Sequence, residues 1–82
     1  GEEFLILLSN TTRDAAAMVG ERLRMAAQVE DYQAEGNAIE LTVSLGCSTL
    51  LPGESAESLV RRADSALYVA KREGRNRLAM AG

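Results

Sequence analysis

The chain begins with a glycine and two acidic residues and continues directly into an apolar run, Phe4 to Leu8, which ends at the polar residues 9–12. The run is too short for a helix, and the absence of polar residues within it is typical of a strand with both faces buried. We therefore expect a strand at residues 3–8 that is covered on both sides.

Apolar positions then recur three and four residues apart, as they do on one face of a helix. Thr11 and Asp14 have the spacing of a capping box, so a helix is predicted from about Thr12 to Val29. Gly20 lies within this helix, where glycine costs about 1 kcal/mol relative to alanine. Its presence indicates close packing against a neighbouring strand or helix.

Residues 30–38 are polar and include the turn signal Gly36-Asn37, which predicts a solvated loop or a short hairpin. From Ile39 to Ser48, apolar residues alternate strictly with polar or small ones. The alternation predicts a strand with one strongly apolar face, formed by Ile39, Leu41, Val43, Leu45 and Cys47.

A second helical pattern follows that strand. Ser55 is the expected N-cap, and the helix should run to about Glu73, with Gly74 in a left-handed C-cap. Residues 77–80 have the pattern of a short terminal strand. The resulting order, β-α-β-α-β, predicts an α+β fold in which one layer of helices packs on an antiparallel or mixed sheet.

The chain has 82 residues and 46% hydrophobic content, which indicates a single domain, residues 1–82, near the lower size limit for one core. Three residues are aromatic, so we expect a core of aliphatic side chains and closely packed alanines, with marginal stability. The formal net charge of −3 argues against binding to a nucleic-acid polymer, where a basic face is expected.

The single cysteine, Cys47, cannot form an intrachain disulfide, which fits a reducing, cytoplasmic compartment, and we expect it to be a small buried core residue. No apolar stretch approaches the roughly 18 to 20 residues of a membrane span, so no membrane contact is expected from this segment. The chain starts at Gly1 rather than at methionine, which indicates a native, proteolytic or engineered fragment of a longer protein.

Two stretches carry candidate chemistry, and the first is Gly1-Glu2-Glu3-Phe4. Carboxylate oxygens suit hard cations such as magnesium, and a glycine lets the backbone approach a nucleotide. Adjacent residues of an extended segment project to opposite sides, so we expect one ligand and one helper rather than two glutamates on a single ion. Taken alone, the stretch is more typical of a solvated acidic strand end.

The second stretch places Asp64, Tyr68, Lys71 and Arg75 three or four residues apart, along one face of the predicted helix and its exit. Lys71 and Arg75 should point to nearly the same place, where they could hold phosphate. Taken alone, they are ordinary cations at a helix C-terminus that complement its dipole.

Together, in this order and at this separation, the two stretches resemble the GGDEF family of diguanylate cyclases. The resemblance covers nearly the whole chain but only about the C-terminal half of the family domain, beginning within the family's Gly-Gly-Asp/Glu-Glu-Phe turn. It implies a ferredoxin-like, nucleotidyl-cyclase-like fold. The segment from Leu41 to Gly46 also resembles a family strand, whose role there is packing.

The activity that the resemblance implies is the condensation of two GTP into cyclic di-GMP by metal-assisted phosphoryl transfer, a reaction of bacterial signal transduction. Two GTP-loaded domains face each other, with two magnesium ions, or manganese, at each GTP site. By resemblance, Glu2 is a metal ligand and the candidate base, Glu3 is the second acidic residue at the metal, Lys71 and Arg75 bind the GTP phosphates, and Gly1 forms the turn at the nucleotide.

The resemblance also assigns Arg22 to a candidate inhibitory site for cyclic di-GMP, although a solvated arginine on a helix surface is the more common case. It places the first metal aspartate, the guanine-binding loop and the Arg-x-x-Asp inhibitory motif upstream of Gly1. We therefore expect the segment to be inactive by itself and to associate through uncovered strand edges, as a homodimer or a domain-swapped sheet. The alternative is a non-catalytic GGDEF-like module that binds nucleotide or a regulatory partner.

Overall fold

The computed structural model describes residues 2–29, 32–34, 37–39 and 42–82. Its elements, in chain order, are β1 (Glu2–Leu8), α1 (Arg13–Val29), β2 (Tyr32–Ala34), β3 (Asn37–Ile39), β4 (Val43–Thr49), α2 (Ala56–Arg72) and β5 (Leu78–Met80). The predicted order of strands and helices is confirmed, and β2 and β3 form the short hairpin. Ile39, which was expected to begin the long strand, belongs to β3 instead, and residues 40–41 lie outside the described residues.

β1, β4 and β5 form a wholly parallel sheet in the order β1-β4-β5. Phe4 lies opposite Leu45, and Leu45 lies opposite Leu78. The predicted antiparallel or mixed sheet is wrong, because the crossovers that contain α1 and α2 carry the chain back before each new strand begins. Within the described residues, antiparallel pairing occurs in the separate β2–β3 sheet.

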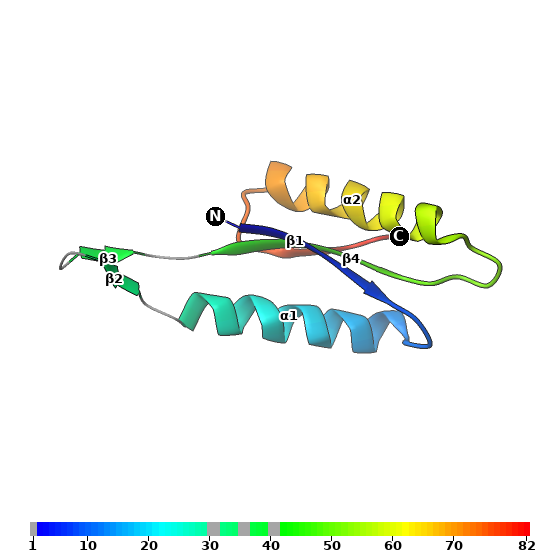
Figure 1. Ribbon diagram of the computed structural model, residues 1–82, viewed down its shortest axis with the longest axis horizontal. Coiled ribbons are helices and arrows are strands. Elements are labelled where there is room, and N and C mark those ends of the chain that lie inside the picture. Colours follow the sequence, from blue (N-terminus) through cyan, green and yellow to red (C-terminus); the bar gives the residue numbers. More distant parts are fainter. Residues whose placement is uncertain (1, 30–31, 35–36, 40–41) are drawn as a thin grey trace.

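The two helices lie on opposite faces of the sheet, so the expected single helical layer is also wrong (Figure 1). Gly46 lets α2 approach closely, because an added Cβ there would lie 2.2 Å from the Ala63 carbonyl oxygen and 2.5 Å from the Leu67 amide nitrogen. Gly20 does the same for α1, since its added Cβ would lie 2.8 Å from Leu78 Cδ1. The close packing predicted at Gly20 is confirmed.

β4 is the centre of the core, with every residue from Val43 to Ser48 buried. The side of the strand that was expected to be polar is covered by α2, where the Ser48 hydroxyl donates to the Leu59 carbonyl oxygen at 2.8 Å. Cys47 is fully buried, as expected, and faces the other side. The alternation therefore separates a small, polar face under α2 from an apolar face over α1.

β1 confirms the predicted strand, but the expectation that both of its faces are buried is wrong. Phe4 is 53% exposed, Leu5 38% and Leu7 42%. The reason is that β1 is an edge strand, which the helices cover only in part: α1 packs mainly against β4 and β5, and α2 packs more on β4 than on β1. An apolar edge is left open.

The first helix begins one residue later than the capping pattern suggested. The hydroxyl oxygen of Thr12 accepts the Ala15 N–H at 3.1 Å. Thr11 instead donates its hydroxyl to the Ser9 carbonyl oxygen at 2.8 Å, so the predicted capping box at Thr11 and Asp14 is wrong. Two adjacent threonines precede the helix, and either could cap it. Thr11 is hydrogen-bonded to the turn before it, so Thr12 is the N-cap.

The second helix begins as predicted, because the hydroxyl oxygen of Ser55 accepts the Ser58 N–H at 3.2 Å. This bond satisfies one of the free amides of the first turn. In the part of the chain that the structure describes, no helix has the length and apolar content that crossing a membrane requires.

Candidate functional site

The beginning of β1 lies beside the end of α2 (Figure 1). β1 runs parallel to β4, and α2 carries the chain back along the sheet, so its last turn reaches the end where the strands begin. The topology therefore joins the two stretches that the sequence singled out.

Glu3 holds two cations from the end of α2. Its Oε1 lies 3.2 Å from Lys71 Nζ, and its Oε2 lies 3.5 Å from Arg75 Nη1. The hydrogen bond from Lys71, together with the charges of Lys71 and Arg75, lowers the pKa of Glu3 and keeps its carboxylate ionised. All three side chains are partly exposed, so these pairs add little to stability and remain open to a ligand.

The backbone after α2 turns sharply and brings Arg75 back toward β1. Gly74 has a φ of 120°, and the Arg75 N–H donates to the Ala70 carbonyl oxygen at 2.9 Å. This bond closes a left-handed helix cap, which confirms the C-cap predicted at Gly74. The left-handed conformation continues through Arg75 and Asn76, with φ values of 61° and 44°.

Glu2 lies on the other face of the sheet. It is opposite Val43 in the register, on the α1 side, whereas Glu3 is opposite Ser44, on the α2 side. The Glu2 backbone N–H donates to the Thr42 carbonyl oxygen at 3.1 Å, and its side chain is exposed. The structure thus brings together Glu3, Lys71 and Arg75, and it separates Glu2 from them.

The comparison with protein families decides the identity. Residues 1–77 match the family described as "Diguanylate cyclase, GGDEF domain". The chain belongs to the GGDEF family. The resemblance that rested on two short stretches is therefore confirmed.

Named relatives of this GGDEF chain come from several bacteria. It is 43% identical over 81 residues to "Diguanylate cyclase A" of Treponema denticola, covering 98% of the chain and 22% of that relative. It is 41% identical over 81 residues to "Diguanylate cyclase DgcP" of Pseudomonas aeruginosa, covering 99% of the chain and 12% of the relative. For "Response regulator PleD" of Caulobacter vibrioides the identity is 37% over 79 residues, with coverages of 93% and 17%. The chain spans less than a quarter of each relative.

The described residues do not by themselves fit a metal centre. Glu3 is engaged by two cations, and Glu2 lies on the opposite face. Among the described residues, no group of three or more His, Cys, Asp or Glu side chains is placed so that it could hold an ion. Magnesium needs an octahedral shell of oxygens, of which these residues offer a small part.

The remaining predicted residues of the GGDEF site are dispersed. Gly1 lies outside the described residues. Arg22 is exposed on α1, across the sheet from Lys71. Tyr68 is 59% exposed, and the Arg72 guanidinium carbon lies 5.8 Å from its ring centroid, so the ring has a cation–π partner of its own.

Sequence reasoning missed Asn76, which lies directly after Arg75. Its backbone N–H donates to Ser44 Oγ at 3.1 Å, and its Oδ1 accepts a hydrogen bond from Arg24 Nη1 at 3.1 Å. The signal available in the sequence was an asparagine two residues after the glycine of the helix C-cap, since asparagine tolerates left-handed backbone better than most residues.

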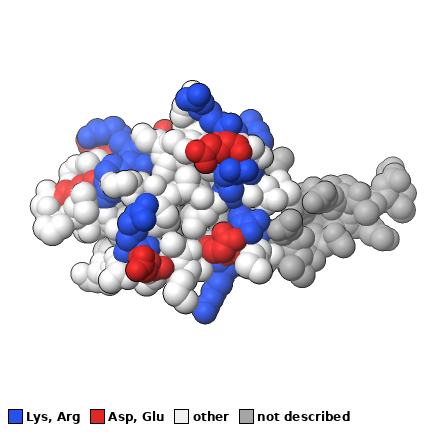
Figure 2. All heavy atoms as spheres, turned by 180° about the vertical axis from the view of Figure 1, so that it is seen from behind, with Lys and Arg blue, Asp and Glu red and all other residues white. Residues whose placement is uncertain are grey.

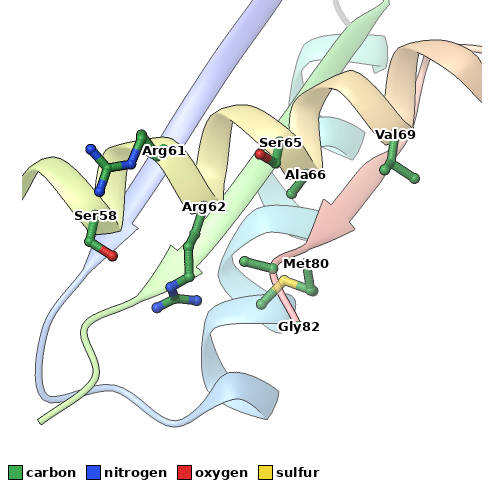
Figure 3. A pocket seen from close by; sticks show the side chains of 9 residues that line it. Ser58, Arg61, Arg62, Ser65, Ala66, Val69, Met80 and Gly82 are labelled. Carbon is green, nitrogen blue, oxygen red and sulfur yellow. The ribbon is translucent and has the colours of Figure 1, made fainter.

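A groove lies between α2 and the end of β5 (Figure 3). It is lined by Ser58, Arg61, Arg62, Ser65, Ala66, Val69, Met80, Ala81 and Gly82. Arg62 turns away from α2 toward the preceding loop, where its Nε lies 2.7 Å from Glu54 Oε2 and its Nη2 donates to the Thr49 carbonyl oxygen. Arg62 therefore stabilises the loop between β4 and α2 through its ion pair with Glu54 and its hydrogen bond to Thr49. The groove lies at the β5 edge of the sheet, and Glu3 lies on β1 at the opposite edge.

Proposed function

We propose that this chain is part of a diguanylate cyclase domain that condenses two GTP into cyclic di-GMP. The observation that carries the proposal is the convergence of Lys71 and Arg75 on the beginning of β1, where a single carboxylate, Glu3, faces both cations. Membership of the GGDEF family and the names of the relatives support it.

The charge balance at this corner favours an anionic ligand. Figure 2 shows positive and negative side chains interspersed over the rear face of the molecule. Other ion pairs among the described residues match one cation with one carboxylate: Arg24–Glu21, Arg62–Glu54 and Arg77–Glu73. Glu3 is shared by two cations, which leaves an excess of positive charge on exposed side chains.

Lys71 and Arg75 have complementary uses in holding a triphosphate. The lysine ammonium is a compact point charge, whereas the arginine guanidinium presents a planar fork that matches phosphate oxygens. Both groups would offset the negative charge that develops on the phosphate during transfer. Before GTP arrives, Glu3 keeps the two cations near the position that the phosphates occupy.

Diguanylate cyclases of the GGDEF family use divalent metal ions. We assign magnesium, or manganese, to the complete domain, with two ions at each GTP site. Glu2 is the proposed ligand and base, since its exposed carboxylate lies apart from the cation pair. Glu3 is retained as the second acidic residue of the metal site, and further ligands must come from beyond the described residues.

We propose that residues 1–82 form the C-terminal half of a cytoplasmic catalytic domain and are inactive by themselves. Joining two GTP molecules requires two loaded sites, so we expect the complete protein to act as a homodimer. The exposed apolar residues of β1 and its open edge give the segment a surface for such association, including a swapped sheet.

The test uses the complete protein that carries this segment. Incubation with GTP and magnesium should yield cyclic di-GMP, detected by chromatography, and a Glu2→Ala variant of unchanged melting temperature should yield none. Product formation that survives Glu2→Ala would refute the role of Glu2. Absence of product from the unmodified protein would refute the activity.

A second candidate function is a GGDEF module that binds GTP without turning it over. The observation in its favour is that Glu3, the second acidic residue, is already paired with two cations. Calorimetric GTP binding by the complete protein, with no cyclic di-GMP formed, would favour this module over the enzyme.

A further inference from the structure

We infer that Asn76 is a positioning residue that fixes the direction of Arg75 toward bound phosphate. The inference rests on the proposed function, because it takes Arg75 as a phosphate-binding group. In the described contacts, Asn76 touches neither Glu3 nor Lys71. It acts through Arg75, its neighbour in the chain.

The first observation is the backbone around Arg75. Gly74, Arg75 and Asn76 have consecutive positive φ values of 120°, 61° and 44°. Glycine adopts this region freely, but residues with a Cβ are held there only when the surrounding structure stabilises them. Asparagine is one of the few residues with a Cβ that adopt positive φ readily, and arginine adopts it rarely. The conformation of Arg75 therefore depends on its own backbone hydrogen bonds and on what fixes the residues on either side.

The second observation is that Asn76 is bound to two layers of the fold. Its backbone N–H donates to Ser44 Oγ at 3.1 Å, and Ser44 is 3% exposed on the central strand. Its Oδ1 accepts from Arg24 Nη1 at 3.1 Å, and Arg24 on α1 is also paired with Glu21. Asn76, the residue after Arg75, is thus hydrogen-bonded to β4 through its backbone and to α1 through its side chain.

The third observation is that, among the described contacts, the Arg75 side chain is held weakly. It is 59% exposed, and its contact with Glu3 is 3.5 Å long. The Arg75 backbone N–H donates to the Ala70 carbonyl oxygen, and the Arg75 carbonyl oxygen accepts from Arg77 Nε at 3.1 Å. The chain after it enters the sheet where the Leu45 N–H donates to the Arg77 carbonyl oxygen at 2.9 Å. Fixing the backbone on both sides reduces the conformational freedom that the arginine loses when it binds phosphate.

The experiment compares variants of the complete protein by steady-state formation of cyclic di-GMP and by thermal melting. Asn76→Ala removes both the acceptor for Arg24 and the tolerance of left-handed backbone. Asn76→Gly restores the backbone freedom without the acceptor, and Asn76→Asp keeps both. Asn10→Ala is the matched control, since Asn10 has a φ of 50° in the turn after β1, away from Arg75.

We expect Asn76→Ala to raise the KM for GTP roughly tenfold or more, with a smaller change in kcat, and we expect the same of Arg75→Ala. Asn76→Gly should lie between Asn76→Ala and the unmodified protein, and Asn76→Asp should be near the unmodified protein. Asn10→Ala should leave both constants unchanged. In a protein that already carries Arg75→Ala, adding Asn76→Ala should have no further effect, because the residue it positions is gone.

Four results would overturn the inference. If Arg75→Ala impairs the enzyme but Asn76→Ala and Asn76→Gly do not, Asn76 does not position it, and the proposed function stands. The same holds if Asn76→Ala impairs the Arg75→Ala protein by its full factor, or if Asn10→Ala raises the KM as much as Asn76→Ala. If Arg75→Ala itself changes nothing, the phosphate-binding role of Arg75 fails, and the inference fails with it.

Discussion

At the scale of single residues, the structure depends on a few positions where a small side chain or a satisfied charge decides what can pack. Gly46 is one, because the backbone of α2 lies where its Cβ would be. Glu54 is another, because Arg62, Ser58 and the Leu51 N–H all donate hydrogen bonds to it. Neither position has to do with the proposed chemistry, so both test the fold separately from the function.

Gly46→Ala should be strongly destabilising, because backbone atoms rather than flexible side-chain ends lie 2.2 Å and 2.5 Å from the added carbon. We expect a loss of about 3 kcal/mol or more in the free energy of unfolding, measured by urea denaturation of the complete protein. Gly53→Ala is the control, since nothing lies within 4 Å of its added Cβ and its φ of 75° costs only about 1 kcal/mol. Equal losses at the two positions would contradict the close approach of α2.

Glu54 predicts a dependence of stability on pH. The hydrogen bond from Arg62, with those from Ser58 and Leu51, lowers the pKa of Glu54 from 4.5 to about 2. A carboxylate whose pKa is lower in the folded state stabilises the fold above its unfolded pKa, and this contribution is lost as the pH falls from about 4.5 to about 2. The melting temperature should therefore fall more steeply over this interval than in Glu54→Gln. Parallel melting curves for the two proteins would contradict the pairing with Arg62.

At the scale of elements, local signals predicted the helices well because capping and periodicity act within a few residues. Ser55 and Gly74 are examples. Ser55 accepts a backbone N–H of the first turn of α2, and the positive φ of Gly74 ends the same helix. The direction and cover of the strands were predicted less well, because pairing depends on where a crossover returns. β1 has the composition of a strand buried on both faces, but its place at the edge of the sheet leaves Phe4 half exposed.

The N-cap of α2 offers a direct test at this scale. Ser55→Ala should cost about 1 kcal/mol in the free energy of unfolding, because the Ser58 N–H loses its acceptor. Ser65→Ala, in the exposed middle of the same helix, should be neutral or slightly stabilising, since alanine is the better helix former. Chemical denaturation distinguishes the two, and a Ser65→Ala loss as large as that of Ser55→Ala would contradict the cap.

The candidate site shows the same division between local and long-range information. The resemblance pointed to Glu3, Lys71 and Arg75, and the topology brings these three together. A shift of one residue in register would exchange Glu2 with Glu3, and the sequence holds no signal that fixes that register. Asn76 was missed because its partners, Ser44 and Arg24, are distant in the sequence and belong to different elements.

At the scale of the whole molecule, the open apolar edge of β1 is the feature with the largest consequence. In the described sheet, β1 has one edge without a partner strand, and a strand with such an edge that exposes Phe4, Leu5 and Leu7 is a template for pairing with another chain. We expect the 82-residue chain to self-associate at micromolar concentration, measured by size-exclusion chromatography with light scattering. Leu7→Lys should weaken this association, because an edge lysine opposes strand pairing. A monodisperse monomer before the substitution would contradict the expectation.

The corner formed by the beginning of β1 and the end of α2 is the part of the molecule on which the functional account depends. The most direct measurement is the kcat/KM for cyclic di-GMP formation by the complete protein carrying either Lys71→Ala or Arg72→Ala. The two changes remove one positive charge each from adjacent positions, but Lys71 faces Glu3 whereas Arg72 stacks on Tyr68. We predict a loss of roughly 100-fold for Lys71→Ala and none for Arg72→Ala. Equal activity in both variants would contradict the proposed phosphate site.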